Sequence, residues 1–151
     1  MRIVIQRCRR ASVTIGGVLK SQIGQGMMIL LGIEEADTDE DIDWLCRKIV
    51  ALRIFDDTEG VMNLPITDVP ESGILLVSQF TLMARTKKGN RPSYIHAAGH
   101  DLAVPLYDAY CDELAQLLGK PTKKGVFGAE MQVALVNDGP VTIIIDSRLK
   151  E

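Results

Sequence analysis

The chain has 151 residues, 46% of them apolar, and 17 basic against 20 acidic residues give it a formal net charge of −3. This length and composition fit a single globular domain over residues 1–151, and the charge excludes the strongly basic class of nucleic-acid-binding proteins. The sequence shows no secretion signal and no apolar run long enough to cross a bilayer, so we expect a soluble cytoplasmic protein that binds no membrane.

The first third of the chain favours β-strands. Residues 2–6 are rich in β-branched side chains, and Gly16-Gly17 lies between two short apolar runs, which is typical of a β-hairpin. Residues 27–33 are continuously apolar and indicate a buried strand. We therefore predict a β-meander here.

Two later segments have helical spacing. The first follows Asp37-Thr38 and opens with acidic residues, which suit a helix N-terminus. Its apolar residues are Ile42, Leu45, Ile49 and Leu52. The second begins within residues 101–105, because proline suits a first helical turn, and it ends at Gly119 and Pro121. Its apolar face holds Leu106, Tyr110, Leu114 and Leu117.

The remaining strands are expected at residues 74–80, 133–136 and 141–145. The last two flank Asn137-Asp138-Gly139-Pro140, which on local grounds predicts a hairpin turn, since proline cannot donate to a β-ladder. Strands outnumber helices and do not alternate regularly with them. We therefore expect an α+β fold, a mainly antiparallel, barrel-like sheet with two helices packed outside it.

Neither the cysteines nor the histidines form a metal-binding pattern. Cys8, Cys46 and Cys111 are odd in number and widely spaced, which indicates reduced core thiols rather than disulfides or a zinc site. His96 and His100 have the spacing of zinc ligands, but H-A-A-G-H lacks the glutamate of the H-E-x-x-H pattern, and no other ligand cluster completes the shell. We expect no metal and no cofactor.

The basic residues gather in three clusters, although seven of the acidic residues lie together within residues 34–43. A single cluster is best interpreted as solvated surface. Three clusters together allow phosphate contact of moderate affinity that depends on salt. The clusters are Arg7, Arg9 and Arg10; Arg85, Lys87, Lys88 and Arg91; and Lys120, Lys123 and Lys124.

Ser78-Gln79-Phe80-Thr81 stands where a buried strand meets a loop. Two hydroxyls and an amide there could supply a nucleophile, or could orient a substrate beside exposed backbone N–H groups. Local bonding of Ser and Thr to the backbone is the commoner reason for such residues at a strand end. Taken alone, the segment leaves both interpretations open.

Several motifs together resemble one family, the bacterial D-aminoacyl-tRNA deacylases, formerly called D-tyrosyl-tRNA deacylases. They are VSQFTL at 77–82, KKGNRPSY at 87–94, GVFGAEM at 125–131 and LVNDGPVT at 135–142. The opening MRIVIQRCRRASVTI and the central MNLPITDV also fit, so the resemblance runs the whole length of the chain in the same order.

The resemblance implies a homodimer with active sites at its interface, which hydrolyses the ester between a D-amino acid and the terminal adenosine at the acceptor 3′ end of aminoacyl-tRNA. Ser78, Gln79, Phe80 and Thr81 would then line the catalytic pocket. Gly139 and Pro140 would be the family's Gly-cisPro element, inserted into the partner's site beside Asn137. The terminal adenosine would contact Phe127, Gly128, Ala129 and Met131.

A site of this kind needs a rigid wall, because D- and L-aminoacyl esters carry the same groups and differ only in the direction of the side chain. Backbone carbonyls of Gly139 and Pro140 could exclude an L side chain, which predicts broad acceptance of D-amino acids and poor rejection of glycine. The ester is already activated, so the N–H groups of Phe80 and Thr81 could suffice as oxyanion donors. The rival is Thr81 as a covalent nucleophile, for which the sequence shows no nearby base.

Two other function classes remain open from the sequence. A nucleic-acid-binding module without turnover would have no need of an enantioselective wall. A small-molecule esterase would cleave free amino-acid esters as efficiently as charged tRNA.

Overall fold

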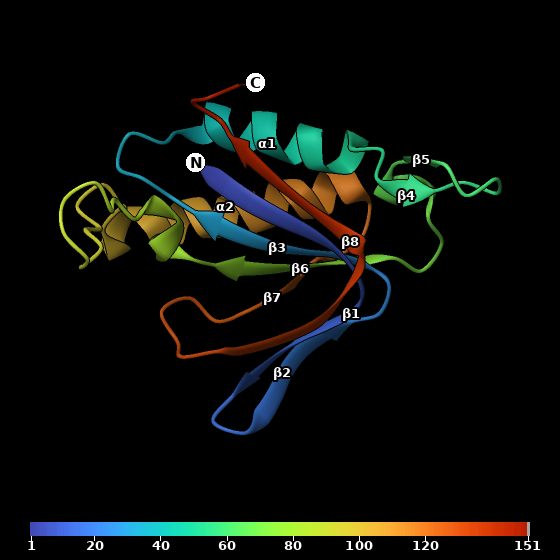
Figure 1. The fold of residues 1–151 in the computed structure, drawn as a ribbon, viewed down its shortest axis with the longest axis horizontal. Helices are drawn as coiled ribbons and strands as arrows, with labels where there is room; N and C mark the ends of the chain where they lie inside the picture. Colours follow the sequence, from blue (N-terminus) through green and yellow to red (C-terminus); the bar gives the residue numbers. More distant parts are fainter. Residues whose placement is uncertain (151) are drawn as a thin grey trace.

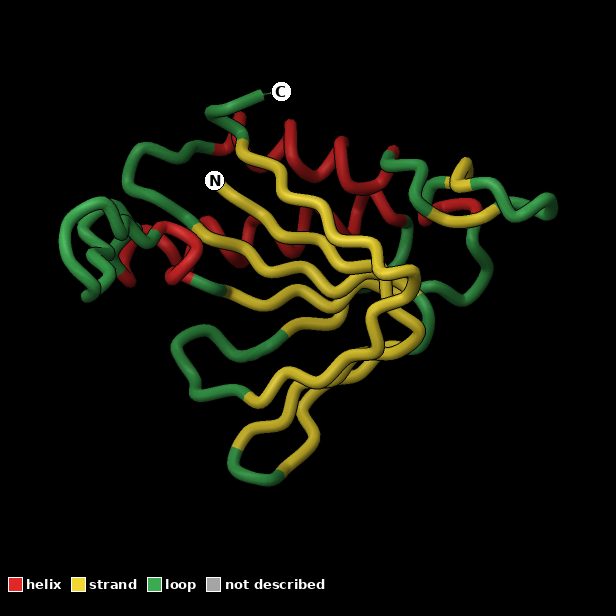
Figure 2. The backbone as a smooth tube through the Cα atoms, in the orientation of Figure 1, coloured by secondary structure: helices red, strands yellow, loops and turns green. Residues whose placement is uncertain are grey.

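The computed structural model describes residues 1–150 (Figures 1 and 2). Its strands are β1 (Arg2–Ile15), β2 (Val18–Ile23), β3 (Gly26–Gly32), β4 (Phe55–Asp56), β5 (Met62–Leu64), β6 (Gly73–Ser78), β7 (Lys123–Lys124) and β8 (Gln132–Asp146). Its helices are α1 (Asp39–Ala51) and α2 (His100–Leu118), with two short 3₁₀ turns, η1 (Ile66–Asp68) and η2 (Phe80–Met83).

The main sheet has the order β2-β1-β3-β6-β7, and β8 pairs with β1. Strand β1 pairs antiparallel with β2, β3 and β8, whereas β3 with β6 and β6 with β7 are parallel. The expected α+β class, with a barrel-like sheet and two helices, is confirmed, and the sheet is mixed because it contains both kinds of pairing. Parallel pairing suits β3 and β6 because both are apolar on both faces.

The predicted β-meander is wrong. Strand β3 does not pair with β2 but returns to the first half of β1, from Arg2↔Gly32 to Cys8↔Gly26. The hairpin at Gly16-Gly17 is present, and β2 pairs with the second half of β1. A 14-residue strand is long enough to serve two partners in succession, and it thereby links the two halves of the sheet.

Both faces of the sheet are buried. One face packs against α1 and α2, which lie beside each other, through residues that include Ile5, Ile29 and Leu76. The other face carries Met28, Leu75 and Val77, and the curled half of the sheet covers it with Cys8, Val133 and their neighbours. The alternation along β6, with Leu75 and Leu76 on opposite faces, follows from the period of two in a strand.

Both helices begin near the predicted positions. Thr38 caps α1, where its backbone N–H donates to Asp41 Oδ2 at 2.8 Å. Helix α2 begins at His100, so Pro105 lies in the second turn rather than the first. It ends at Gly119, whose φ of 73° is left-handed and suits glycine as a C-cap.

The segment 137–140 does not reverse the chain, so the predicted hairpin turn is wrong. Strand β8 runs through it and pairs with β1 on both sides, with Asn137 opposite Cys8 and Thr142 opposite Gln6. Five steps along β8 therefore match two along β1, and the extra residues form a bulge at which β8 bends sharply (Figure 1). A bulge accommodates Pro140 because its residues have no partner in the ladder.

The three cysteines are free and buried, as predicted. Burial raises the pKa of Cys8 and Cys111 to about 11 and that of Cys46 to about 12. No helix in residues 1–150 is long and apolar enough to span a membrane.

Candidate functional site

A cavity of about 300 Å³ opens between the ends of β3 and β6, the start of α2 and the segment after β7. It brings together two segments singled out from the sequence and far apart in it, 78–80 and 127–131. No side chain in its lining is acidic, basic or a thiol. The lining residues are Leu31, Ile33, Val77, Ser78, Gln79, Phe80, Ala98, Ala103, Phe127, Gly128, Ala129, Met131 and Val133.

The floor of the cavity is the junction between β6 and η2. The Gln79 N–H donates to the Leu31 carbonyl at 2.8 Å, and the Gln79 side-chain Nε2 donates to Thr81 Oγ1 at 2.5 Å. Thr81 lies beside the cavity lining rather than in it. Among the hydrogen bonds of residues 1–150, none uses the N–H of Phe80 or Thr81, as expected for the first residues of a helical turn. These two donors remain available next to Ser78.

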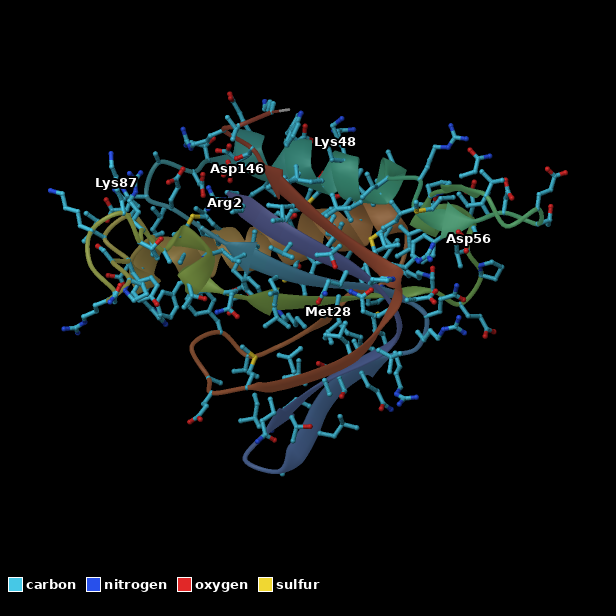
Figure 3. The ribbon with its side chains drawn as sticks, viewed as in Figure 1. Arg2, Met28, Lys48, Asp56, Lys87 and Asp146 are labelled. Carbon is cyan, nitrogen blue, oxygen red and sulfur yellow. The ribbon has the colours of Figure 1, made fainter. Side chains whose placement is uncertain are left out.

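Two residues that the sequence did not single out hold η2 in place. At Gly32 a Cβ atom would lie 2.9 Å from Leu82 Cβ and 3.1 Å from the Gln79 carbonyl oxygen, so only glycine lets η2 pack this closely on β3. Arg2 donates from Nη1 to the Leu82 carbonyl at 2.9 Å and pairs with Asp146 at 2.9 Å (Figure 3). Neither role has a local sequence signal, because the partners are distant along the chain.

Phe127 forms the opposite wall with two aromatic neighbours on α2. Its ring lies edge-on to His100 and Tyr107, with centroids 5.5 and 5.6 Å away. The Tyr107 hydroxyl donates to the Leu76 carbonyl at 3.0 Å, which ties this wall to β6. Gly128 follows with a left-handed φ of 75° in a turn that the Ala129 N–H closes by donating to Val126. His100 is thus a packing residue, and no three potential metal ligands cluster within the described residues.

The bulge of β8 lies apart from this cavity within the same chain. Gly139 and Pro140 are exposed, the peptide bond between them is cis, and neither lines the cavity, nor does Asn137. The Asn137 side chain braces the bulge from inside, since Oδ1 accepts from the Val141 N–H at 2.9 Å. The bulge is therefore exposed at Gly139 and Pro140 and held in shape by its own hydrogen bond.

Arg7 fixes the bulge to the rest of the sheet, so its interpretation as solvated surface or a phosphate contact is wrong. Its side chain is only 8% exposed. Its Nε donates to the Asp138 carbonyl at 3.1 Å, and Nη1 donates to the Ile54 carbonyl at 2.7 Å and to Asp56 Oδ1 at 3.1 Å. Arg9, which is exposed, also pairs with Asp138 at 3.1 Å.

Comparison with known proteins shows one family over nearly the whole chain. The model of the family described as D-Tyr-tRNA(Tyr) deacylase matches residues 4–146. Curated proteins named D-aminoacyl-tRNA deacylase from Phocaeicola vulgatus and Bacteroides fragilis are each 62% identical over the full length of both chains.

Solved structures show the same fold. One titled c-Myc DNA Unwinding Element Binding Protein is 41% identical, with a TM-score of 0.91 over 97% of this chain and 98% of that one. Another, titled as a probable eukaryotic D-amino acid tRNA deacylase, is 20% identical, with a TM-score of 0.81 over 95% and 97% of the two chains.

Proposed function

The chain belongs to the D-Tyr-tRNA(Tyr) deacylase family, and we propose that it hydrolyses the ester of D-aminoacyl-tRNA to free D-amino acid and tRNA. The observation that carries this proposal is the shared cavity of residues 78–80 and 127–131. It joins a polar strand end, suited to ester chemistry, to an aromatic wall, suited to a nucleobase. The terminal adenosine then lies against Phe127, Gly128, Ala129 and Met131.

The chemistry needs little from side chains. Water adds to the ester carbonyl carbon, the resulting oxyanion accepts hydrogen bonds from the N–H groups of Phe80 and Thr81, and the ribose oxygen leaves with a proton. No lining residue can act as a general base, since the lining holds no histidine, carboxylate or amine. We assign the relay of the proton to the ribose hydroxyl next to the ester, so that the substrate assists its own hydrolysis.

Selection between D and L substrates falls to Gly139 and Pro140 of a second copy of the chain. Both residues are exposed and stand outside the cavity of their own chain, so they can act only where another copy's cavity receives them. The hydrogen bond that Arg7 donates to the Asp138 carbonyl and the one that Asn137 accepts from the Val141 N–H keep the bulge rigid. A homodimer with this exchange excludes L side chains by contact with backbone, accepts many D side chains, and rejects glycine poorly, which amounts to chiral proofreading in translation.

A second candidate is nucleic-acid binding without turnover. The observation in its favour is the name of the 41% identical structure, a DNA unwinding element binding protein. A binding module does not require the cavity next to η2, so we place it second.

Hydrolysis of D-Tyr-tRNA and L-Tyr-tRNA by the purified protein separates the candidates. We expect rapid release of D-tyrosine and little release of L-tyrosine. Binding of nucleic acid without D-selective release would favour the second candidate, and equal cleavage of free amino-acid esters would favour an esterase. Sedimentation of the same preparation tests the dimer.

A further inference from the structure

The loop of residues 84–93 is a strongly basic surface next to the candidate site. It contains Arg85, Lys87, Lys88 and Arg91, all exposed, and no acidic residue. None of the four takes part in an ion pair within residues 1–150. We call residues 84–93, with these four cations, the basic loop.

The other two basic clusters are partly neutralised. In the first, Arg7 and Arg9 pair with Asp138. In the third, Lys124 pairs with Asp108 at 3.5 Å, and Lys120 donates to the Ser72 carbonyl. The basic loop is therefore the cluster in which all four cations are without an ion pair among the described residues.

The basic loop has a defined base and a hollow beside it. The backbones of Arg85 and Ser93 exchange two hydrogen bonds of 2.8 and 3.0 Å, which close the loop directly after η2. A groove of about 410 Å³ runs along its base, lined by Arg2, Arg85, Lys87 and His96 among others. The acidic lining residue, Glu34, pairs with Arg148 at 3.0 Å, so the groove presents mainly positive charge.

Exposed aromatic rings connect the basic loop to the cavity. Phe80, at the cavity mouth, is 57% exposed, and its ring lies edge-on to Tyr94, which is 37% exposed, at 5.0 Å between centroids. Cations that alternate with exposed aromatic rings are typical of surfaces for single-stranded nucleic acid, because phosphates meet the charges and bases stack on the rings. Figure 3 shows Lys87 at the opposite end of the molecule from Asp56, the partner of Arg7.

We propose that the basic loop and the Phe80–Tyr94 pair bind the single-stranded 3′ end of tRNA, with Arg85 and Lys87 on the phosphates that precede the terminal adenosine. This inference rests on the proposed function, since it assigns the path by which that substrate reaches the cavity. It makes the loop a determinant of preference for tRNA over a minimal ester.

The test compares two substrates that share the reacting ester, D-Tyr-tRNA and D-tyrosyl adenosine, which has no phosphate. In the double variant Arg85→Gln/Lys87→Gln, we expect the ratio of kcat/KM for tRNA over adenosine ester to fall about tenfold at roughly 0.1 M salt. The salt dependence of log KM for tRNA should weaken by about 0.7 for each phosphate that the variant no longer binds. The control is Lys20→Gln/Lys48→Gln, which removes the same charge from exposed positions on β2 and α1 and should keep the wild-type ratio.

The possible outcomes distinguish an error in the role of the basic loop from an error in the proposed reaction. An equal fall in that ratio in the control would show only a general charge effect and would overturn the assignment. An unchanged ratio and salt slope in the Arg85→Gln/Lys87→Gln variant, with the wild type active, would overturn it as well. Absence of D-selective turnover of both substrates by the wild type would overturn the proposed function and this inference with it.

Discussion

Arg2, at the start of β1, donates a hydrogen bond from Nη1 to the carbonyl oxygen of Leu82 at 2.9 Å, and so ties the first strand to the turn that forms the cavity floor. The same guanidinium pairs with Asp146 at the end of β8. One side chain therefore connects the first strand, the last strand and η2.

Arg2→Met should lower kcat more than it raises KM, because η2 loses its tether while the adenosine wall is untouched. We expect a loss of about 1 kcal/mol in unfolding free energy, since the ion pair is partly exposed. Arg47→Met is the control, because Arg47 is also an exposed arginine and pairs with Asp43 within α1 rather than with η2. Steady-state kinetics and urea unfolding measure both effects, and equal kinetic losses in the two variants would refute the tether.

Thr81→Ala should retain activity within about tenfold of wild type, because the described partner of its hydroxyl is the Gln79 amide at 2.5 Å, which cannot accept a proton as a base. Single-turnover hydrolysis of D-Tyr-tRNA measures this. A loss of three or more orders of magnitude in a folded variant would instead support Thr81 as the nucleophile.

Gly32→Ala should destabilise the fold by about 1–3 kcal/mol and reduce kcat/KM, because the new methyl group would meet Leu82 Cβ at 2.9 Å and push η2 away from β3. Gly24→Ala is the control, since a Cβ there has no atom within 4 Å. Thermal unfolding and kinetics of the pair test the close packing, which would be disproved by wild-type behaviour of Gly32→Ala.

Arg7→Met should cost about 2 kcal/mol and weaken discrimination between D- and L-Tyr-tRNA, because the Asp138 and Ile54 carbonyls lose a buried charged donor. Arg9→Met removes the exposed partner of the same Asp138 and should cost less than about 0.5 kcal/mol. The D/L ratio of kcat/KM is the decisive measurement. An unchanged ratio in Arg7→Met would show that chiral selection does not depend on the hydrogen bonds between Arg7 and the bulge.

The thiols should resist alkylation until the protein unfolds. At pH 8.5 the folded thiols stay protonated, since burial raises their pKa to about 11 for Cys8 and Cys111 and about 12 for Cys46. Unfolded thiols ionise near pH 8.5, so stability is full below that pH and falls as pH rises through the folded pKa values. Iodoacetamide labelling with and without urea measures this, and rapid labelling of one thiol in the native state would contradict it.

Short sequence patterns predicted correctly the helices and the hairpin that are stabilised by contacts between residues close together in the sequence. The spacing of Ile42, Leu45 and Ile49 marked α1, and Gly16-Gly17 marked the hairpin, because each signal lies within one turn or one pair of strands. The continuity of β8 was missed, since Pro140 argues locally against a strand and only pairing with β1 shows that a bulge absorbs it.

The resemblance predicted three site segments but not the residues that support them. Residues 78–80 and 127–131 line one cavity, Thr81 lies beside that lining, and Asn137, Gly139 and Pro140 lie outside the cavity of their own chain. The roles of Arg2 and Arg7 depend on partners 47 to 144 positions away, and that of Gly32 depends on the space between β3 and η2, so no local pattern encodes them. The apolar runs of β3 and β6 did carry a signal for parallel pairing, because strands buried on both faces lack polar alternation.

The pairing of β1 with β8 along nearly its whole length has a consequence for biosynthesis. The ribosome makes β1 before β8, so the edge of β1 that pairs with residues 132–146 stays unmatched until that segment has been made. Contacts this far apart in sequence also slow folding. The sheet can close only after residues 132–146 have emerged, so until then the open edge of β1 can pair with other chains.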